Sequence, residues 1–314
     1  MSLALVTLSH SPLMAFTEPS PSTRSRVDEA FSAARSFVED FSPELVVLFG
    51  PDHYNGFFYD MMPPFCIGAA ATAVGDYDTP AGPLSVDRDA ALALVQGVLD
   101  VDIDVAVSER MYVDHGFAQP LQLLFGGIDR VPVVPVFINS VAEPLGPARR
   151  SRLLGQAIGQ AAQQLDRRVL VIGSGGLSHD PPVPSLEGAS PEVAASLISE
   201  GRTLTPEQRA ARQRRVIEGG RDFVAGVATI APLNPAWDRN VLSVLASGNL
   251  DQIDTWSTSW FTEQAGHSSH ETRTSIAAYA ALATAGSYQV ELSYYEAIPE
   301  WIAGFAITTA RTTT

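Results

Sequence analysis

Three of the six histidines in the chain follow short apolar segments, and imidazole both binds metal ions and moves protons near neutral pH. The segments, each ending at its histidine, are Leu3–His10, Glu44–His53 and Arg168–His179. Each is aliphatic and then broken by Gly, Pro or Ser, which is typical of a buried strand. Ligands of an open α/β sheet bind at the carboxyl ends of its strands. If the three strands are parallel neighbours, their histidines point into one crevice.

The chemistry that such a crevice favours is metal binding. Neutral imidazole and carboxylate suit zinc or non-haem iron, and two histidines with one carboxylate leave positions open for Fe(II) chemistry. The ligands would come from distant parts of the chain, so their spacing neither selects them nor separates iron from zinc. A zinc-dependent hydrolase and a non-catalytic binding protein are therefore alternatives, and any single histidine could instead be a hydrogen-bonded structural residue.

The elements that must position these histidines alternate between strands and helices. The sequence predicts helices over residues 24–41, 87–99, 150–165, 206–224 and 270–285. It predicts a strand with one solvent-exposed face over residues 101–107. It also predicts an edge or irregular strand over residues 131–138, because that segment contains two prolines. Residues 54–85 are expected to form a long ordered loop, and residues 114–117 a turn.

These elements predict an α/β fold, with a central, mostly parallel or mixed sheet flanked by helices and a metal site at the carboxyl ends of the strands. Residues 3–49 alone have the order strand, loop, helix, strand, which favours a parallel pair with a right-handed crossover. We expect a single domain over residues 1–314, with a helical elaboration around residues 185–265.

The amino-acid composition argues against several classes of function. The net charge of −15 argues against nucleic-acid binding, because no basic field exists to displace counterions. All positive charge is arginine, and the one cysteine, Cys66, excludes an intrachain disulfide and a cysteine zinc site. No apolar run approaches the roughly 20 residues that span a bilayer, and the start lacks the features of a signal peptide. We expect a soluble cytoplasmic protein that does not bind membranes.

Seven segments of the chain resemble one enzyme family, the class III extradiol dioxygenases, whose superfamily includes the β-subunit of protocatechuate 4,5-dioxygenase. The two longest and most specific matches are GPDHYNGFFYD, within a longer matching stretch, and LSHDPPVP. The matching segments run nearly from end to end of the chain: LSHSPL, SPELVVLFGPDHYNGFFYDMMPPFC, VDHGFAQPL, VPVFIN, GSGGLSHDPPVP, LNPAWD and IPEWIAGF.

The resemblance implies a reaction and a set of residues for it. It implies non-haem Fe(II) held by His10, His53 and Glu271, with His115 as proton donor and His179 as proton acceptor. It also implies that both atoms of O2 are inserted into a 3-substituted catechol with meta ring cleavage, and that the enzyme is a homo-oligomer. The substrate would be of the 2,3-dihydroxyphenylpropionate or 2,3-dihydroxycinnamate type, in aromatic-acid catabolism. Cleavage of another substituted catechol is an alternative.

Several neighbouring residues have competing interpretations. Glu271 could instead close a capping box with Ser268 at the start of a helix. Asp114 could orient an imidazole by accepting a hydrogen bond from the ring nitrogen that does not bind the metal, or it could simply form a turn. Tyr54 and Pro181 are candidates for substrate contacts. An anionic side chain on the substrate requires a nearby arginine, but the sequence supports none of the three considered, Arg24, Arg110 and Arg273.

Overall fold

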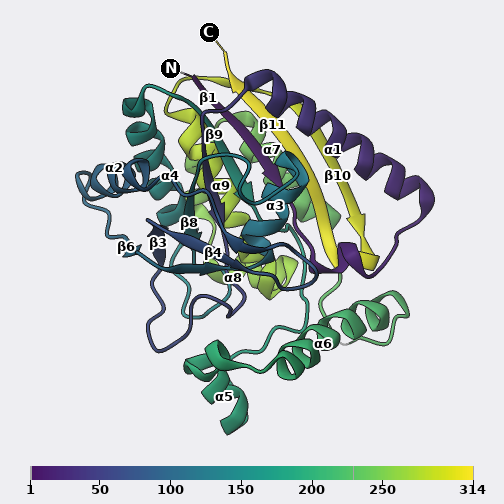
Figure 1. Cartoon of the computed structure of the whole chain (residues 1–314). Helices are drawn as coiled ribbons and strands as arrows, with labels where there is room; N and C mark the ends of the chain where they lie inside the picture. Colours follow the sequence, from purple (N-terminus) through teal and green to yellow (C-terminus); the bar gives the residue numbers. More distant parts are fainter. Residues whose placement is uncertain (1, 229, 314) are drawn as a thin grey trace.

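An eight-stranded mixed sheet forms the centre of the computed structural model, which describes residues 2–228 and 230–313 (Figure 1). In spatial order its strands are β10 (Tyr288–Ile298), β11 (Ala303–Thr312), β1 (Ser2–Leu8), β9 (Arg168–Ser174), β2 (Leu45–Gly50), β8 (Val133–Ile138), β3 (Phe65–Gly68) and β6 (Ala106–Ser108). A smaller three-stranded sheet joins β5 (Ala81–Pro83), β4 (Ala71–Val74) and β7 (Met111–Val113). The predicted α/β class is confirmed.

The three strands that end near histidines are parallel neighbours. β9 lies between β1 and β2 and pairs in parallel with both. In the register, Leu8 lies opposite Ser174 and Phe49 lies opposite Gly173. The three carboxyl ends are therefore level, as the sequence interpretation required.

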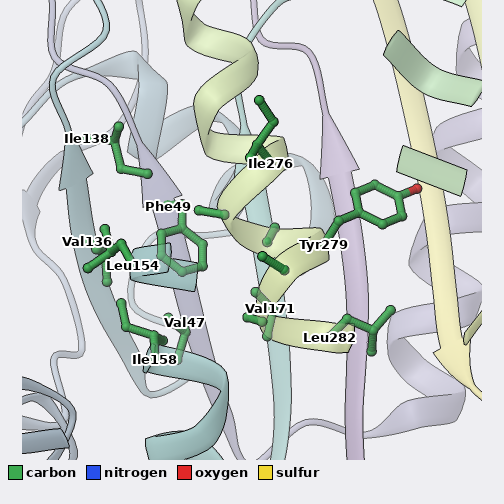
Figure 2. Packing of buried hydrophobic residues seen from close by; sticks show 14 of the residues in the cluster. Val47, Phe49, Val136, Ile138, Leu154, Ile158, Val171, Ile276, Tyr279 and Leu282 are labelled. Carbon is green, nitrogen blue, oxygen red and sulfur yellow. The ribbon is translucent and has the colours of Figure 1, made fainter. Parts of the chain in front are cut away.

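Helices cover both faces of the sheet because alternate strand residues point to opposite sides. On one face, Val47 and Phe49 belong to a core that includes residues of α2 (Arg88–Leu99), α4 (Ala148–Ala162), α7 (Pro235–Ser247) and α9 (Thr272–Ala283). Figure 2 shows side chains of α4 and α9 packed against these strands. On the other face, Val46 and Leu48 belong to a core with α1 (Pro21–Phe41) and α3 (His115–Phe125).

Small residues let α9 lie unusually close to its neighbours. A Cβ atom on Gly155 of α4 would collide with the backbone of Ala277, and one on Gly173 of β9 would lie 2.9 Å from the Cα atom of Ser275. The one-turn 3-10 helix η5 (His267–Glu271) precedes α9, so the predicted helix of small residues is present but divided. This close packing fixes the start of α9 directly above the end of β9.

One group of helices projects from the body of the molecule (Figure 1). We call α5 (Pro191–Ile198), η3 (Glu200–Thr203) and α6 (Pro206–Val224) the arm. The helix predicted over residues 206–224 is confirmed as α6, and a capping box between Thr205 and Gln208 fixes its start. The remaining helical elements are η1 (Pro12–Ala15), η2 (Gln163–Leu165), η4 (Leu250–Thr255), α8 (Thr258–Ala265) and η6 (Pro299–Trp301). Within the described ranges, no helix combines the length and apolar character needed to cross a membrane.

The strand predicted over residues 131–138 is present as β8, but it does not lie at an edge of the sheet. β8 lies inside the sheet between β2 and β3, and all its residues are buried. Pro135 is tolerated there because the ladder with β3 ends at the adjacent pair of Ile67 and Val136, so β3 needs no donor from the proline. Gly68 leaves space for the ring, since a Cβ atom on it would lie 2.9 Å from Pro135 Cγ.

Four other local predictions need correction. Residues 54–85 are not one loop, since they contain β3, β4 and β5. The strand predicted over residues 101–107 shrinks to β6, because Val101 and Asp102 form a turn. α1 begins at Pro21 and not at Arg24, because Ser20 caps it. Residues 114–117 begin α3 and do not form an isolated turn.

Candidate active site

Five residues converge where β1, β9 and β2 end. His10, His179 and His53 follow these strands, His115 is the first residue of α3, and Glu271 ends η5. All five line one cavity that is open to solvent at its mouth. The structure thus brings together every residue for which the sequence predicted a metal-binding or acid–base role.

The Glu271 carboxylate is the centre of this cluster. Its Oε1 atom lies 3.1 Å from Nε2 of His53 and 3.1 Å from Nε2 of His179, and its Oε2 atom lies 3.4 Å from Nε2 of His10. The residue is only 1% exposed. Within residues 2–228 and 230–313, no arginine forms an ion pair with it. A buried carboxylate surrounded by ring nitrogens is a site that a cation would stabilise.

The capping-box interpretation of Glu271 is wrong. Gly266, not Ser268, is the N-cap of η5 and supplies no side-chain cap, and Glu271 itself makes no capping hydrogen bond to α9. Instead, the backbone N–H of Gly176 donates to Glu271 Oε2 at 3.1 Å. The carboxylate is held towards the end of β9 and away from its own helix.

The glycines after β9 make this approach possible. A Cβ atom on Gly175 would lie 2.5 Å from the Glu271 carbonyl oxygen, and one on Gly176 would lie 2.7 Å from the His179 ring. Either contact would push a site residue away, because real Cβ contacts are longer than this. The Gly-Ser-Gly-Gly segment therefore permits close packing of Glu271 and His179 against the strand end.

Hydrogen bonds to the Nδ1 atoms set the orientation of the imidazoles. The Ser174 hydroxyl donates to Gly116 O at 2.6 Å, so it accepts from His10 Nδ1 at 2.9 Å. His53 donates through Nδ1 to Asp114 Oδ2 at 3.0 Å. Nε2 of both imidazoles then faces Glu271, the orientation that hydrogen-bond partners on the other ring nitrogen produce at metal sites.

The two histidines with expected acid–base roles are anchored in the same way. His179 donates through Nδ1 to Leu177 O at 2.9 Å, and His115 donates through Nδ1 to Asp76 Oδ2 at 2.6 Å. Nε2 is then the atom of each ring that can exchange a proton with a ligand. Across the described residues, Nε2 of His115 has no hydrogen-bond partner.

Charge within the cluster is strongly coupled. Burial lowers the pKa of His10 to about 3, which keeps this imidazole neutral. Burial alone would raise the pKa of Glu271, but His179 and His10 hold it well below its usual range. Burial would lower the pKa of His53 and His179, yet Asp114 and Glu271 raise the first well above its ordinary value and Glu271 raises the second. The buried carboxylates thus stay ionised and demand positive charge.

Two groupings of donor atoms compete for a metal ion. The first is the predicted set of His10, His53 and Glu271. In the second, donor atoms of His10, His53 and His115 all lie within 4.8 Å of one another. The rings of His53 and His115 are stacked, with centroids 4.5 Å apart. Both groupings share His10 and His53 and differ in the third ligand. Donor atoms of Asp76, Asp114 and His115 also lie within 4.8 Å of one another, in a grouping that includes neither His10 nor His53.

Asp114 orients an imidazole, and in place of the expected turn it caps a helix. Its Oδ1 atom accepts from Gly116 N at 2.9 Å as the cap of α3, and its Oδ2 atom accepts from the backbone and ring of His53. It orients His53, not the adjacent His115. His115 is oriented by Asp76, which the sequence interpretation missed because Asp76 lies 39 residues away within the presumed loop.

Other candidates are divided between the cavity and its surroundings. Pro181 lines the cavity, whereas the Tyr54 side chain packs with Phe58 in a separate apolar cluster and does not line it. None of the arginines considered for a substrate carboxylate lines the cavity: Arg24, Arg110 and Arg273. Two arginines that the sequence did not single out, Arg212 and Arg215 of α6, do line it.

Comparison with known proteins agrees with this geometry. The model of the catalytic LigB subunit of aromatic ring-opening dioxygenase matches residues 4–306. The chain belongs to this family. The dioxygenase prediction is therefore confirmed, and the chain is a ring-opening enzyme of the extradiol type. The LigB match favours this function over a hydrolase or a binding protein.

Curated relatives of the LigB-family chain cover almost its full length. A protein from Rhodococcus jostii is 63% identical over 310 residues, covering 99% of this chain and 98% of its own. A protein from Rhodococcus sp is 64% identical over 310 residues with the same coverage, and one from Mycolicibacterium gilvum is 57% identical over 311 residues. All three are named 2,3-dihydroxyphenylpropionate/2,3-dihydroxicinnamic acid 1,2-dioxygenase.

Proposed function

We propose that the chain is an Fe(II)-dependent extradiol dioxygenase that cleaves 2,3-dihydroxyphenylpropionate and 2,3-dihydroxycinnamate. The names and the high identity of its relatives support this substrate class. The observation that carries the metal proposal is the buried Glu271 carboxylate, which faces the Nε2 atoms of three imidazoles. A divalent cation among these atoms would balance its charge.

We assign the metal ligands as His10, His53 and Glu271. Two imidazoles and one carboxylate form the donor set of non-haem Fe(II) oxygenases with open coordination positions. Choosing His115 as the third ligand would leave the Glu271 charge without an arginine or a metal to balance it. When bound there, Fe(II) supplies a binding point for both catechol oxygens and the electrons that activate O2.

His179 is proposed to accept a proton from the catechol. Its Nδ1–H is committed to Leu177 O, so the lone pair that takes the proton is on Nε2, which faces the cavity cluster. Imidazole titrates near neutral pH, which suits a general base at this position. The Leu177 carbonyl also stabilises the protonated ring.

His115 is proposed to have the opposite role to His179 and to donate a proton during ring cleavage. Asp76 fixes its ring through Nδ1 and stabilises the charged imidazolium before the proton leaves from Nε2. Both residues are buried, so bulk water does not compete for that proton. Leu13, Trp301 and Ile302 add apolar wall to the cavity, which excludes water and packs the aromatic ring of the substrate.

The proposal is tested by anaerobic reconstitution of the purified protein with Fe(II), followed by exposure to air with 2,3-dihydroxyphenylpropionate. We expect uptake of one O2 per catechol, incorporation of both labelled atoms from ¹⁸O2, and the coloured ring-opened product. Reconstitution with Zn(II) is the matched control and should give no O2 uptake. Absence of uptake and product with every metal and with a panel of 3-substituted catechols would overturn the proposal.

A further inference from the structure

The proposed chemistry does not use two arginines in the cavity wall, Arg212 and Arg215 of α6. They are three residues apart, so they lie on one face of the helix. The same face continues with Val216, which lines the cavity, and with Gly219, where a Cβ atom would lie 2.9 Å from Pro182. The side of α6 that meets the body therefore presents two guanidinium groups to the cavity.

Both guanidinium groups lack a carboxylate partner in the part of the chain that the structure describes. Arg212 donates to the main-chain carbonyl oxygens of His53 and Tyr54, which are neutral acceptors and leave its charge unbalanced. Within residues 2–228 and 230–313, no hydrogen bond or ion pair holds the exposed Arg215. By contrast, Arg202 on the same arm pairs with Asp60.

Two unbalanced cations at one cavity are notable in a chain with a net charge of −15. The overall field of such a protein repels anions, so an anionic ligand needs local positive charge. The remaining wall includes Leu13, Trp301 and Ile302, which are apolar. The cavity therefore suits a ligand with a metal-binding ring, an apolar linker and an anionic end.

We infer that Arg215, supported by Arg212, binds the carboxylate on the substrate side chain and thereby selects anionic 3-substituted catechols. This inference rests on the proposed function. A guanidinium group matches a carboxylate with two parallel hydrogen bonds, and Arg215 is free to form both. Arg212 adds charge, and its bonds to the two carbonyls tie α6 to the loop that carries His53.

The test compares an anionic with a neutral substrate on the Fe(II)-loaded enzyme. The anionic substrate is 2,3-dihydroxyphenylpropionate, and the neutral one is 3-propylcatechol, which has a side chain of similar length. We expect Arg215→Gln to lower kcat/KM for the anionic substrate about 10- to 100-fold, chiefly through KM, the loss expected for one charged hydrogen-bonded pair. The value for the neutral substrate should change little. Arg215→Lys should restore part of the loss, because it keeps the charge without the planar fork.

Arg214→Gln is the matched control, because it removes the same charge from the adjacent position, which does not line the cavity. It should leave both kcat/KM values unchanged. The inference is overturned if Arg215→Gln lowers kcat/KM equally for both substrates, or if Arg214→Gln has the same effect as Arg215→Gln.

Failure of the proposed function would look different, because the wild-type enzyme would then cleave neither catechol. Calorimetric titration with 3-phenylpropionate, which has the carboxylate but no catechol, still decides the role of Arg215, since it requires no turnover. Binding should be about 10- to 100-fold weaker in Arg215→Gln than in the wild type and in Arg214→Gln. Equal affinity in all three proteins would overturn the inference.

Discussion

The sheet end and the arm contribute to the same cavity but are held in place by different forces. At the sheet end, every residue of β2 is buried, and so is every residue from Ser268 to Ser275. In the arm, the buried residues are Leu197, Gly201 and Gly220. The arm is attached by arginine contacts, from Arg202 to Asp60 and from Arg212 to the loop after β2. Backbone N–H groups of Tyr59 and Asp60 also donate to carbonyls of α5, and partly buried apolar side chains of α6 pack on the core.

This difference in packing corresponds to a difference in proposed role, with metal binding and proton transfer at the sheet end and recognition of the substrate side chain at the arm. Metal ligands and proton-transfer groups must keep their positions to within a fraction of an ångström, and a close-packed sheet end provides that rigidity. Recognition of a side chain tolerates more movement, and a lightly packed arm can vary without disturbing the metal ligands. We therefore expect substitutions at the sheet end to have the larger effects, and those in the arm to act mainly on substrate preference.

The largest expected effect is that of Glu271→Gln at the sheet end. The substitution keeps the volume but removes the negative charge, so the protein should lose most of its Fe(II). Activity should fall more than about 1000-fold, because the metal supplies several kcal/mol of stabilisation to the reaction. Metal analysis after gel filtration and O2 uptake are the measurements. Full iron content in Glu271→Gln would remove Glu271 from the ligand set and favour His115 in its place.

The next largest effects are those of His179→Ala and His115→Ala. Both should retain iron and lose about 100- to 10,000-fold in kcat, the range typical of a missing general acid or base. Iron content and kcat are measured on the same preparation, with His10→Ala as the comparison that should lose iron. Loss of iron from either variant would make that histidine a ligand and contradict its assignment to proton transfer.

Sequence reasoning succeeded where one local pattern determines a structure. The strands before His10, His53 and His179 were predictable because a short aliphatic run that ends at Gly, Pro or Ser is typical of a buried strand. The helix over residues 206–224 was predictable for a similar reason, since Thr205 and Pro206 mark its start. The strand–helix–strand arrangement of residues 3–49 favoured a parallel pair, but β1 and β2 are not direct neighbours, because β9 lies between them.

The errors arose where distant residues decide the outcome. Pro135 suggests an edge strand, but the end of the β3 ladder at Ile67 removes the need for its donor. Asp76 carries no local sign that it orients His115, because only the fold brings them together. Arg215 is one of several arginines on a charged helix, and its place in the cavity depends on how the arm docks. No spacing rule along the chain encodes such contacts.

Asp76→Asn tests the positioning of His115 and should have an intermediate effect. The neutral amide stabilises the charged imidazolium less well, so kcat should fall about 10- to 100-fold while iron is retained. The pH dependence of kcat should shift as well, which a merely structural role would not cause. Asp78→Asn is the control, because it makes the same change at an exposed position two residues away. A fall in iron content instead of kcat would place Asp76 behind the metal and not behind the proton donor.

The smallest effect is expected for Arg202→Ala in the arm. Its ion pair with Asp60 is about two-fifths exposed on each side, and its guanidinium lies 4.5 Å from the centre of the Phe58 ring. Exposed pairs of this kind contribute about 0–1 kcal/mol to the free energy of unfolding.

The comparison variant is Ile158→Ala, which removes a buried side chain from the core. It should lower the free energy of unfolding by about 2–5 kcal/mol. Denaturant unfolding measures both, and limited proteolysis should cut the arm of Arg202→Ala faster. Equal destabilisation by the two variants would mean that the arm is as firmly packed as the sheet end, and the proposed division between rigid chemistry and adaptable recognition would fail.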